Sequence, residues 1–328
     1  MTERFPLNTQ FPVATIVGYP RIGPDRELKR ATEAYWKGSL SEAELVTITQ
    51  ELKDKTYARL VDLGLGKDDY SIPETFSLYD QVLDTAVAFD AIPTRYEDLS
   101  GLDQYFALAR GNETLGALEM TKWFDTNYHY LVPELDADAC FAFTGGNKLE
   151  EFNRAREAGY LVRPTFVGPV TFLALAKAAE GAPEGWAPLD LIDDLAAAYA
   201  ELLAAFHEAG ADWIQFDEPA LVTDNLEELS DRPALLVTLP YGDGTEAAGR
   251  LAETGIEALQ LDLRRTPEPS PKLVGKLSGK TLVAGVVEGR NIWRADLRAA
   301  EALLQKLQDA GAGSLSACTA TSLQHVPI

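Results

Sequence analysis

The chain has 328 residues, of which 46% are apolar and 24% charged, the composition of a globular protein with a large core. Its formal net charge of −22 argues against binding nucleic acid or an anionic membrane, because phosphate contacts need an excess of Lys and Arg. No apolar run is long enough to span a bilayer, and the first residues lack a signal-peptide pattern. The two cysteines, Cys140 and Cys318, predict a reducing cytoplasm, not a disulfide scaffold.

Apolar, β-branched runs alternate with amphipathic segments along the chain. Strands are predicted over 14–19, 162–167, 212–217, 234–239, 258–263, 281–287 and 313–318, with weaker candidates over 70–75 and 127–132. Helices are predicted over 24–35, 42–63, 191–209 and 298–310. Ser41 and Glu44 form a capping box before the second of these helices.

Strands that alternate with helices predict a parallel sheet covered by helices. An open doubly wound sheet and a closed (β/α)8 barrel both fit the pattern, but no Gly-x-Gly-x-x-Gly motif follows a strand, as a dinucleotide-binding sheet would require. We therefore predict an α/β fold, a (β/α)8 TIM barrel with an extended N-terminal helical excursion, as one domain over residues 1–328. Nine candidate strands are one too many, and the 127–132 run is expected to lie outside the barrel.

Functional residues of such barrels lie just after the strands. After the first strand, Arg26, Lys29 and Arg30 share one face of a predicted helix. Cations at a helix N-terminus oppose the macrodipole, and a bound anion would offset that cost by using the free N–H groups and the side chains together. The alternative is a solvated face whose cations pair with Glu27 and Glu33.

The segment 119–130 is dense in aromatic and hydrogen-bonding residues around Lys122 and Trp123. Aromatic faces beside a lysine suit a flat heterocycle or an anionic tail. The alternative is a partly buried aromatic corner with Lys122 in an ion pair.

Two further groups follow predicted strands. Asp217 and Glu218 could bind substrate hydroxyls or amines, act as bases or coordinate a cation. The alternative is capping and loop fixing beside Pro219, which restrains the turn. Arg290 either lies near an acid or fixes its loop.

The sequence gives little support for a metal site or for a nucleophilic catalytic residue. The histidines, His129, His207 and His325, show no His-x-x-x-His or His-x-Cys spacing, so no metal site is predicted. The chain has no Gly-x-Ser-x-Gly elbow and no phosphate-binding loop.

Five motifs follow one another along the chain. They are Gly18-Tyr-Pro-Arg-Ile-Gly23 leading into Arg26-Glu-Leu-Lys29, Met120-Thr-Lys-Trp-Phe-Asp-Thr-Asn-Tyr-His-Tyr130, Gly168-Pro-Val-Thr171, Asp217-Glu-Pro-Ala220 and Gly289-Arg-Asn-Ile-Trp-Arg294. Together they resemble the N-terminal domain of cobalamin-independent methionine synthase, a 5-methyltetrahydropteroyltriglutamate–homocysteine methyltransferase built of two face-to-face barrels.

The resemblance implies a folate-polyglutamate site and a partner barrel. It assigns folate polyglutamate binding to Arg26, Glu27, Leu28, Lys29 and Lys122. Weaker candidates for the site are Arg21, Trp123, Asp217, Glu218 and Arg290. It also implies that zinc is held by the C-terminal barrel, covalently attached or separate, so that this chain has no cofactor, no catalytic residue and no turnover alone.

Two alternatives remain open. One is a stand-alone folate-binding or regulatory barrel. The other is a metal-free small-molecule enzyme that uses Asp217, Glu218 and Arg290 on the same scaffold, since the fold alone does not determine chemistry.

Overall fold

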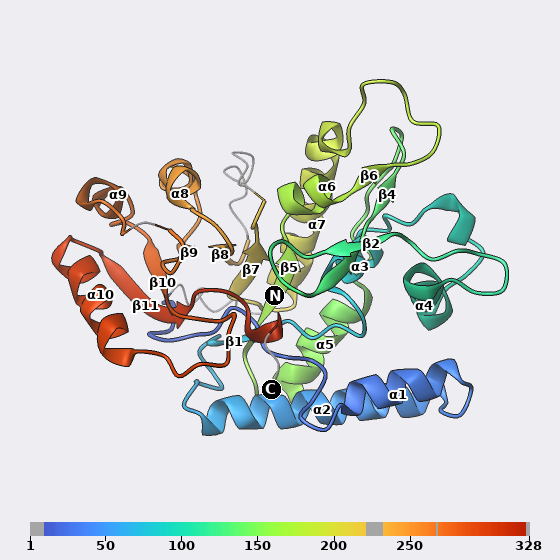
Figure 1. The fold of residues 1–328 in the computed structure, drawn as a ribbon, viewed down its shortest axis with the longest axis horizontal. Helices are drawn as coiled ribbons and strands as arrows, with labels where there is room; N and C mark the ends of the chain where they lie inside the picture. Colours follow the sequence, from blue (N-terminus) through green and yellow to red (C-terminus); the bar gives the residue numbers. More distant parts are fainter. Residues whose placement is uncertain (1–9, 221–231, 267, 326–328) are drawn as a thin grey trace, which may run out of the picture.

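A curled sheet of seven parallel strands organises the chain (Figure 1), in the order β1-β5-β7-β8-β9-β10-β11. The computed structural model describes residues 10–220, 232–266 and 268–325. The strands are β1 (Ile72–Glu74), β5 (Val162–Val167), β7 (Trp213–Asp217), β8 (Ala234–Leu239), β9 (Ala258–Asp262), β10 (Thr281–Val287) and β11 (Ser314–Thr319). All seven were predicted, each within two residues at either end, because their apolar runs are buried on both faces of the sheet.

The predicted strand over 14–19 is wrong as a strand. Ala14 forms only an isolated parallel bridge with Ala317, beside β11. On the other side, the Thr15 hydroxyl donates to the Ser71 carbonyl at 2.6 Å, next to β1. Backbone hydrogen bonds join the segment to β11 only around that bridge, and side-chain oxygens accept elsewhere, as where Val17 N donates to a threonine hydroxyl at 3.2 Å. The segment therefore contacts both ends of the sheet without forming a regular strand.

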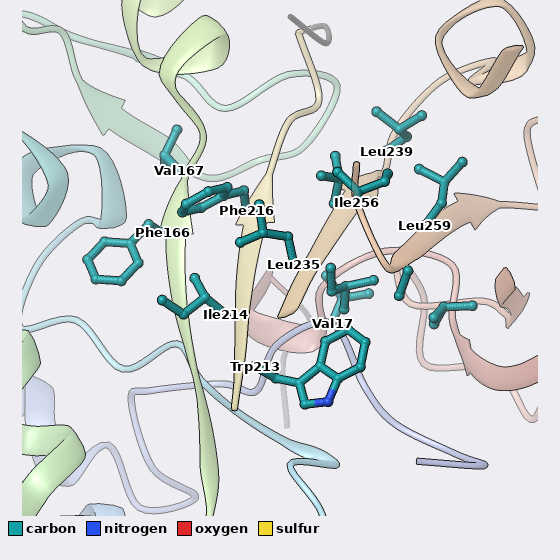
Figure 2. Packing of buried hydrophobic residues seen from close by; sticks show 14 of the residues in the cluster. Val17, Phe166, Val167, Trp213, Ile214, Phe216, Leu235, Leu239, Ile256 and Leu259 are labelled. Atoms are coloured by element: carbon teal, nitrogen blue, oxygen red, sulfur yellow. The ribbon is translucent and has the colours of Figure 1, made fainter. Parts of the chain in front are cut away.

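Helices pack on the outside of the sheet, where α8, α9 and α10 follow its curve (Figure 1). The helices after β1 that accompany the sheet are α5 (Gly146–Glu157), α6 (Pro169–Leu175), α7 (Ile192–Glu208), α8 (Thr245–Leu251), α9 (Pro271–Lys276) and α10 (Leu297–Asp309). The predicted stripe of α7 is buried, and its Phe206 and Tyr199 rings lie 5.5 and 5.3 Å from Phe166 and Phe216 of the sheet. Figure 2 shows part of this core, with labelled side chains from β5, β7, β8 and β9.

The N-terminal excursion forms a second hydrophobic cluster. It is built from α1 (Glu27–Trp36), α2 (Glu42–Asp62), α3 (Gln81–Ala88), the 3-10 turn η1 (Thr94–Tyr96) and α4 (Gly101–Arg110). The capping box is confirmed, since the Ser41 hydroxyl accepts from Glu44 N while the Glu44 carboxylate accepts from Ser41 N. The first helix begins later than predicted, because Arg26 has a left-handed backbone (φ 62°) that regular helix cannot contain.

The 127–132 run lies outside the main sheet, as predicted. It contains β3 (His129–Leu131), which pairs with β2 (Met120–Lys122) in an antiparallel hairpin. The buried Asp80 carboxylate anchors the hairpin, because it caps α3 and also accepts from Leu131 N at 3.1 Å. The remaining short elements are β4 (Glu134–Leu135), β6 (Lys177–Ala178), η2 (Pro188–Leu191) and η3 (Leu323–His325). In the part of the chain that is described, no helix combines the length and apolarity needed to cross a membrane.

A fully buried arginine lies inside the curled sheet. Arg163 of β5 donates to the Gln215 side chain of β7 at 2.8 and 3.0 Å and to the Tyr70 carbonyl. It also donates to the Thr15 hydroxyl at 3.1 Å and to the Ile16 carbonyl at 3.2 Å. Burial lowers the pKa of this guanidinium to about 10, so it stays charged at neutral pH. Arg163 therefore joins β5, β7 and the amino-terminal segment.

Replacing Arg163 with Met leaves the Gln215 side chain and the Thr15 hydroxyl without their buried donor. Arg163→Met is expected to lower the free energy of unfolding by about 3–5 kcal/mol, as measured by urea denaturation. The control is Arg250→Met, which removes an exposed pair with Glu246 and is expected to change stability by less than about 0.5 kcal/mol. Equal stability of the two variants would contradict a structural role for Arg163.

Candidate functional site

The carboxyl ends of the parallel strands share one edge, and the turn of the β2–β3 hairpin reaches across it. The Phe124 ring stacks on Tyr241, which follows β8, with centroids 5.8 Å apart and planes 7° apart. The Arg290 guanidinium, after β10, pairs with the Asp125 carboxylate and also donates to its carbonyl. These contacts bring the predicted aromatic segment and the predicted Arg290 segment together at one site.

A small hollow of about 30 Å³ joins two of the weaker candidates, Arg21 and Trp123. Arg21 donates to the Leu78 carbonyl at 3.0 Å, which holds its loop against the chain that follows β1. Trp123 is only 3% exposed, and its ring meets Phe124 and Tyr130 edge to face. Trp123 therefore positions the hairpin, and the structure matches the aromatic-corner alternative for this residue.

Lys122 itself is exposed on β2. Within the described residues it forms no ion pair, so the ion-pair alternative for Lys122 is not observed. No hydrogen bond or ion pair in that part of the chain links Lys122 to residues 26–29. The structure thus leaves the Lys122 ammonium open to solvent near the hairpin turn.

The start of α1 presents exposed cations, and of its backbone N–H groups that of Leu28 already donates to the Ile22 carbonyl at 3.1 Å. Arg26 is exposed, has φ 62°, and no side chain caps the helix. Glu27 instead accepts from Asp25 N at 3.0 Å, and Leu28 is buried. Lys29 lies 3.7 Å from the Glu33 carboxylate, and both side chains are about half exposed. Lys29 therefore lies on a solvated helix face and pairs with Glu33, as the alternative interpretation expected. Because this pair is exposed, it is weak, and Lys29 can exchange Glu33 for another anion.

Asp217 and Glu218 end β7 and are both buried. Asp217 accepts from the Gln215 amide and the Thr238 hydroxyl, each at 2.7 Å, and burial raises its pKa to about 6. Glu218 accepts from the backbone N–H groups of Val170 and Thr171, at 3.1 and 2.8 Å, at the start of α6. Burial raises the pKa of Glu218 to about 8. Glu218 thus has the capping role that the sequence left as an alternative.

Steric exclusion explains why the Gly168-Pro-Val-Thr171 motif begins with glycine. A Cβ at Gly168 would lie 2.3 Å from the Glu218 carboxyl group, so only glycine leaves room for this buried acid. The motif and the Asp217-Glu218 pair therefore form one structural unit across β5, α6 and β7.

Several residues of the edge were not singled out from the sequence. Asp125 lies inside the segment 119–130 and Tyr241 follows the predicted strand over 234–239, but nothing local in the sequence marks the contacts that either residue makes. The buried Asp262 accepts from Tyr241 N at 3.2 Å and pairs with Arg265 at 2.8 Å. Only their position in the sequence could have identified Tyr241 and Asp262 as residues of this edge, because both stand at the carboxyl ends of predicted strands.

The described residues of this chain do not fit a zinc site. Among the described residues, no group of three or more His, Cys, Asp and Glu side chains is placed to hold a metal. Cys318 is buried, and burial raises the pKa of its thiol to about 12, whereas zinc binds a thiolate.

Comparisons with known proteins agree on one family. The family profile described as cobalamin-independent synthase, N-terminal domain, matches residues 13–312. The chain is 46% identical over 338 residues to a Mycobacterium tuberculosis protein named 5-methyltetrahydropteroyltriglutamate–homocysteine methyltransferase, covering 98% of this chain and 44% of that protein. The protein of the same name from Mycobacterium leprae is 45% identical over 337 residues, with 98% and 43% covered. The chain thus spans less than half the length of these curated relatives.

Solved structures share the fold. A B12-independent methionine synthase from Shewanella, in complex with selenomethionine, aligns with a TM-score of 0.64 at 15% identity, covering 98% of this chain and 92% of that one. A Listeria monocytogenes protein described as a vitamin-B12-independent methionine synthase aligns with a TM-score of 0.65 at 14% identity, covering 95% and 92%. At these identities the likeness concerns the fold alone.

The buried Glu218 makes stability depend on pH. Its pKa rises from 4.5 to about 8 on folding, so between these values the folded state holds a proton that the unfolded state has lost. The contribution of Glu218 to the free energy of unfolding therefore rises as the pH falls, by about 2 kcal/mol from pH 8 to pH 6. Urea titrations measure this contribution together with those of Asp80 and Asp217, whose pKa values burial raises to about 7 and about 6. Glu218→Gln is expected to reduce this difference, while Glu246→Gln, at an 80% exposed side chain, preserves it. An unchanged pH dependence in Glu218→Gln would contradict the assignment.

Proposed function

The chain belongs to the cobalamin-independent methionine synthase family, with the sequence of its N-terminal domain, and we propose that it is the folate-binding half of a methyltransferase. In the reaction that the relatives' name describes, a methyl group passes from 5-methyltetrahydropteroyltriglutamate to homocysteine. This half would bind the polyglutamate tail of the methyl donor. The observation that carries the proposal is the start of α1, where exposed cations meet at a helix end without a side-chain cap, in a chain of net charge −22.

Each assigned residue has a distinct role in this proposal. Arg26 and Lys29 bind carboxylates of the tail at the positive end of the α1 dipole. Glu27 holds the preceding loop by accepting from Asp25 N, and the buried Leu28 anchors the helix. The left-handed backbone of Arg26 supports a functional role, because strained non-glycine residues persist where they serve binding.

The hairpin turn supplies the second contact. Lys122 is exposed beside it, and we assign this ammonium to another carboxylate of the tail. Trp123, Arg21 and Arg290 orient the hairpin and the loop before α1 instead of touching the tail, since each is engaged within the protein. This half therefore binds and orients the methyl donor but supplies no reacting group.

The activation of homocysteine is assigned to the remainder of the enzyme. A zinc ion held by that remainder would supply the chemistry that makes a thiol a nucleophilic thiolate at neutral pH, and the described part of this chain has no group of three or more His, Cys, Asp and Glu side chains that could bind one. The metal-free alternative loses support because Asp217 and Glu218 are buried acceptors and Arg290 is paired with Asp125.

An exposed apolar loop supports docking of a second barrel at this edge. Ile292, Trp293 and Leu297 follow β10 and are 70%, 79% and 69% exposed. They continue from Arg290, which holds the hairpin turn. We infer that the catalytic barrel, attached or separate, covers this loop and encloses the proposed folate site. The free cysteines Cys140 and Cys318 further support a cytoplasmic location.

We also propose that the sheet closes into a (β/α)8 barrel with the segment 13–18 in the eighth position. This segment contacts β11 through Ala317 and the start of β1 through Ser71. Arg163 binds it from inside.

Closure predicts slow hydrogen exchange for two backbone groups. Thr15 N donates to the Ala317 carbonyl and Ala317 N to the Val13 carbonyl, each at 3.0 Å. Both amides are expected to exchange at least about 100-fold more slowly than an exposed loop amide such as that of Gly185. Exchange of the Thr15 amide at the loop rate would mean that the barrel is open at this seam.

The folate site is tested by calorimetry with 5-methyltetrahydrofolate triglutamate at low and moderate salt. Binding is expected to weaken as salt rises, and Lys29→Ala with Lys122→Ala should weaken it by at least about tenfold, because two charge contacts are lost. The matched control is Lys276→Ala with Lys306→Ala, two exposed lysines on α9 and α10 that pair with Glu253 and Glu268.

Equal affinity of the two double variants would contradict the site. If the chain alone does not bind, the titration is repeated with the catalytic half of a relative added. Binding only in the mixture places the tail between the two halves, and no binding in either case rejects the proposed function.

A further inference from the structure

A cavity of about 530 Å³ lies between α2, α3, α4 and α5, in the N-terminal excursion. Its volume is in the range of small-molecule sites. None of the residues assigned to folate binding lines it. The residues that line it form a charged wall on one side and an apolar wall on the other. The proposed methyl transfer uses neither wall.

The charged wall is a chain of buried ion pairs with alternating sign. The Lys148 ammonium lies 3.1 Å from the Glu74 carboxylate and 4.0 Å from that of Asp84. The Lys53 ammonium lies 2.9 Å from Glu151 and 3.8 Å from Glu74. The two longer distances exceed hydrogen-bond length, so these charges attract one another without a direct hydrogen bond. The wall therefore offers carboxylates to a bound ammonium and ammonium groups to a bound carboxylate.

The apolar wall belongs to the second hydrophobic cluster, with Leu45, Leu78, Val87 and Leu102 among its residues. Thr49 also lines the cavity and is 9% exposed, and its buried hydroxyl has no hydrogen-bond partner within the described residues. A buried hydroxyl without a partner is unfavourable, and a polar group of a bound molecule would satisfy it.

We propose that this cavity binds a free α-amino acid with an apolar side chain. A dianion would meet Glu74 and Asp84, and a dication would meet Lys53 and Lys148. A hydrocarbon would remove water from the charged wall without pairing with its charges, which is unfavourable. A zwitterion matches both signs at once, and its side chain packs against the apolar wall. This inference is independent of the proposed folate site.

The zwitterion requirement is tested by calorimetry on the full chain. The probes are L-methionine, L-leucine and L-phenylalanine, beside 4-(methylthio)butanoate and 3-(methylthio)propylamine, which are methionine without its ammonium and without its carboxylate. Methionine is expected to bind with a Kd of about 0.01–1 mM. Each of its two analogues should bind at least about tenfold more weakly than methionine, or not at all. No binding by any amino acid up to about 10 mM, or binding of either analogue as tight as that of methionine, overturns the proposal.

The location is tested by filling the cavity without touching its charges. Val46 lines the cavity from α2 and is 42% exposed, so Val46→Trp is expected to fold and to abolish amino-acid binding. The matched control is Leu63→Trp, at a 67% exposed residue that ends the same helix and does not line the cavity. Equal amino-acid affinity in the two variants overturns the location.

A third variant tests the unpartnered hydroxyl. Thr49→Val keeps the side-chain shape and is expected to weaken amino-acid binding several-fold while the melting temperature does not fall. Loss of melting temperature with unchanged affinity would assign the hydroxyl to the fold instead. Folate triglutamate binding should be the same in Val46→Trp as in the unmodified chain, so failure of this proposal is distinguishable from failure of the folate site.

Discussion

The fold depends on one buried guanidinium. Arg163 has no exposed surface, and placing a charge inside a sheet is tolerated only when its donors are satisfied. Its donors reach Gln215, the Tyr70 carbonyl and the amino-terminal segment, three parts of the chain far apart in sequence. Gln215 passes the interaction on, since its amide donates to Asp217 at 2.7 Å. A single cation thereby connects the seam of the sheet to a carboxylate at the edge where the strands end.

At that edge the buried acids serve the scaffold. Glu218 caps α6, which requires glycine at position 168, and Asp262 holds Arg265 and the backbone of Tyr241. Arg290 is paired as well, with Asp125. Within the described residues, the exposed Lys122 forms no ion pair, and its ammonium is a group that the proposed anionic tail would bind.

The curated relatives extend well beyond this chain, and its strand-end edge carries exposed apolar side chains after β10, as the proposed docking of a second barrel requires. The cavity of the N-terminal excursion differs from the proposed folate site. Charges of both signs are buried there against apolar side chains, which is the environment that a zwitterion needs and a polyanion does not.

The sequence by itself determined the strands of the sheet, the capping box at Ser41, the separate position of the 127–132 run and the family. These follow from local periodicity, local hydrogen bonding and motif order, which neighbouring residues carry. The α/β class with a parallel sheet followed from the same alternation, but the sequence could not show that the 14–19 run forms only an isolated bridge to β11.

Only the tertiary structure decided what the candidate residues contact. Trp123 is buried and not offered to a ligand, Glu218 caps a helix, and Arg290 pairs with Asp125, 165 residues away in the chain. Thr49 and the charged wall of the cavity carry no local signal at all. Burial and pairing of this kind arise between segments that approach only when the sheet curls, and for that reason no pattern along the sequence contains them.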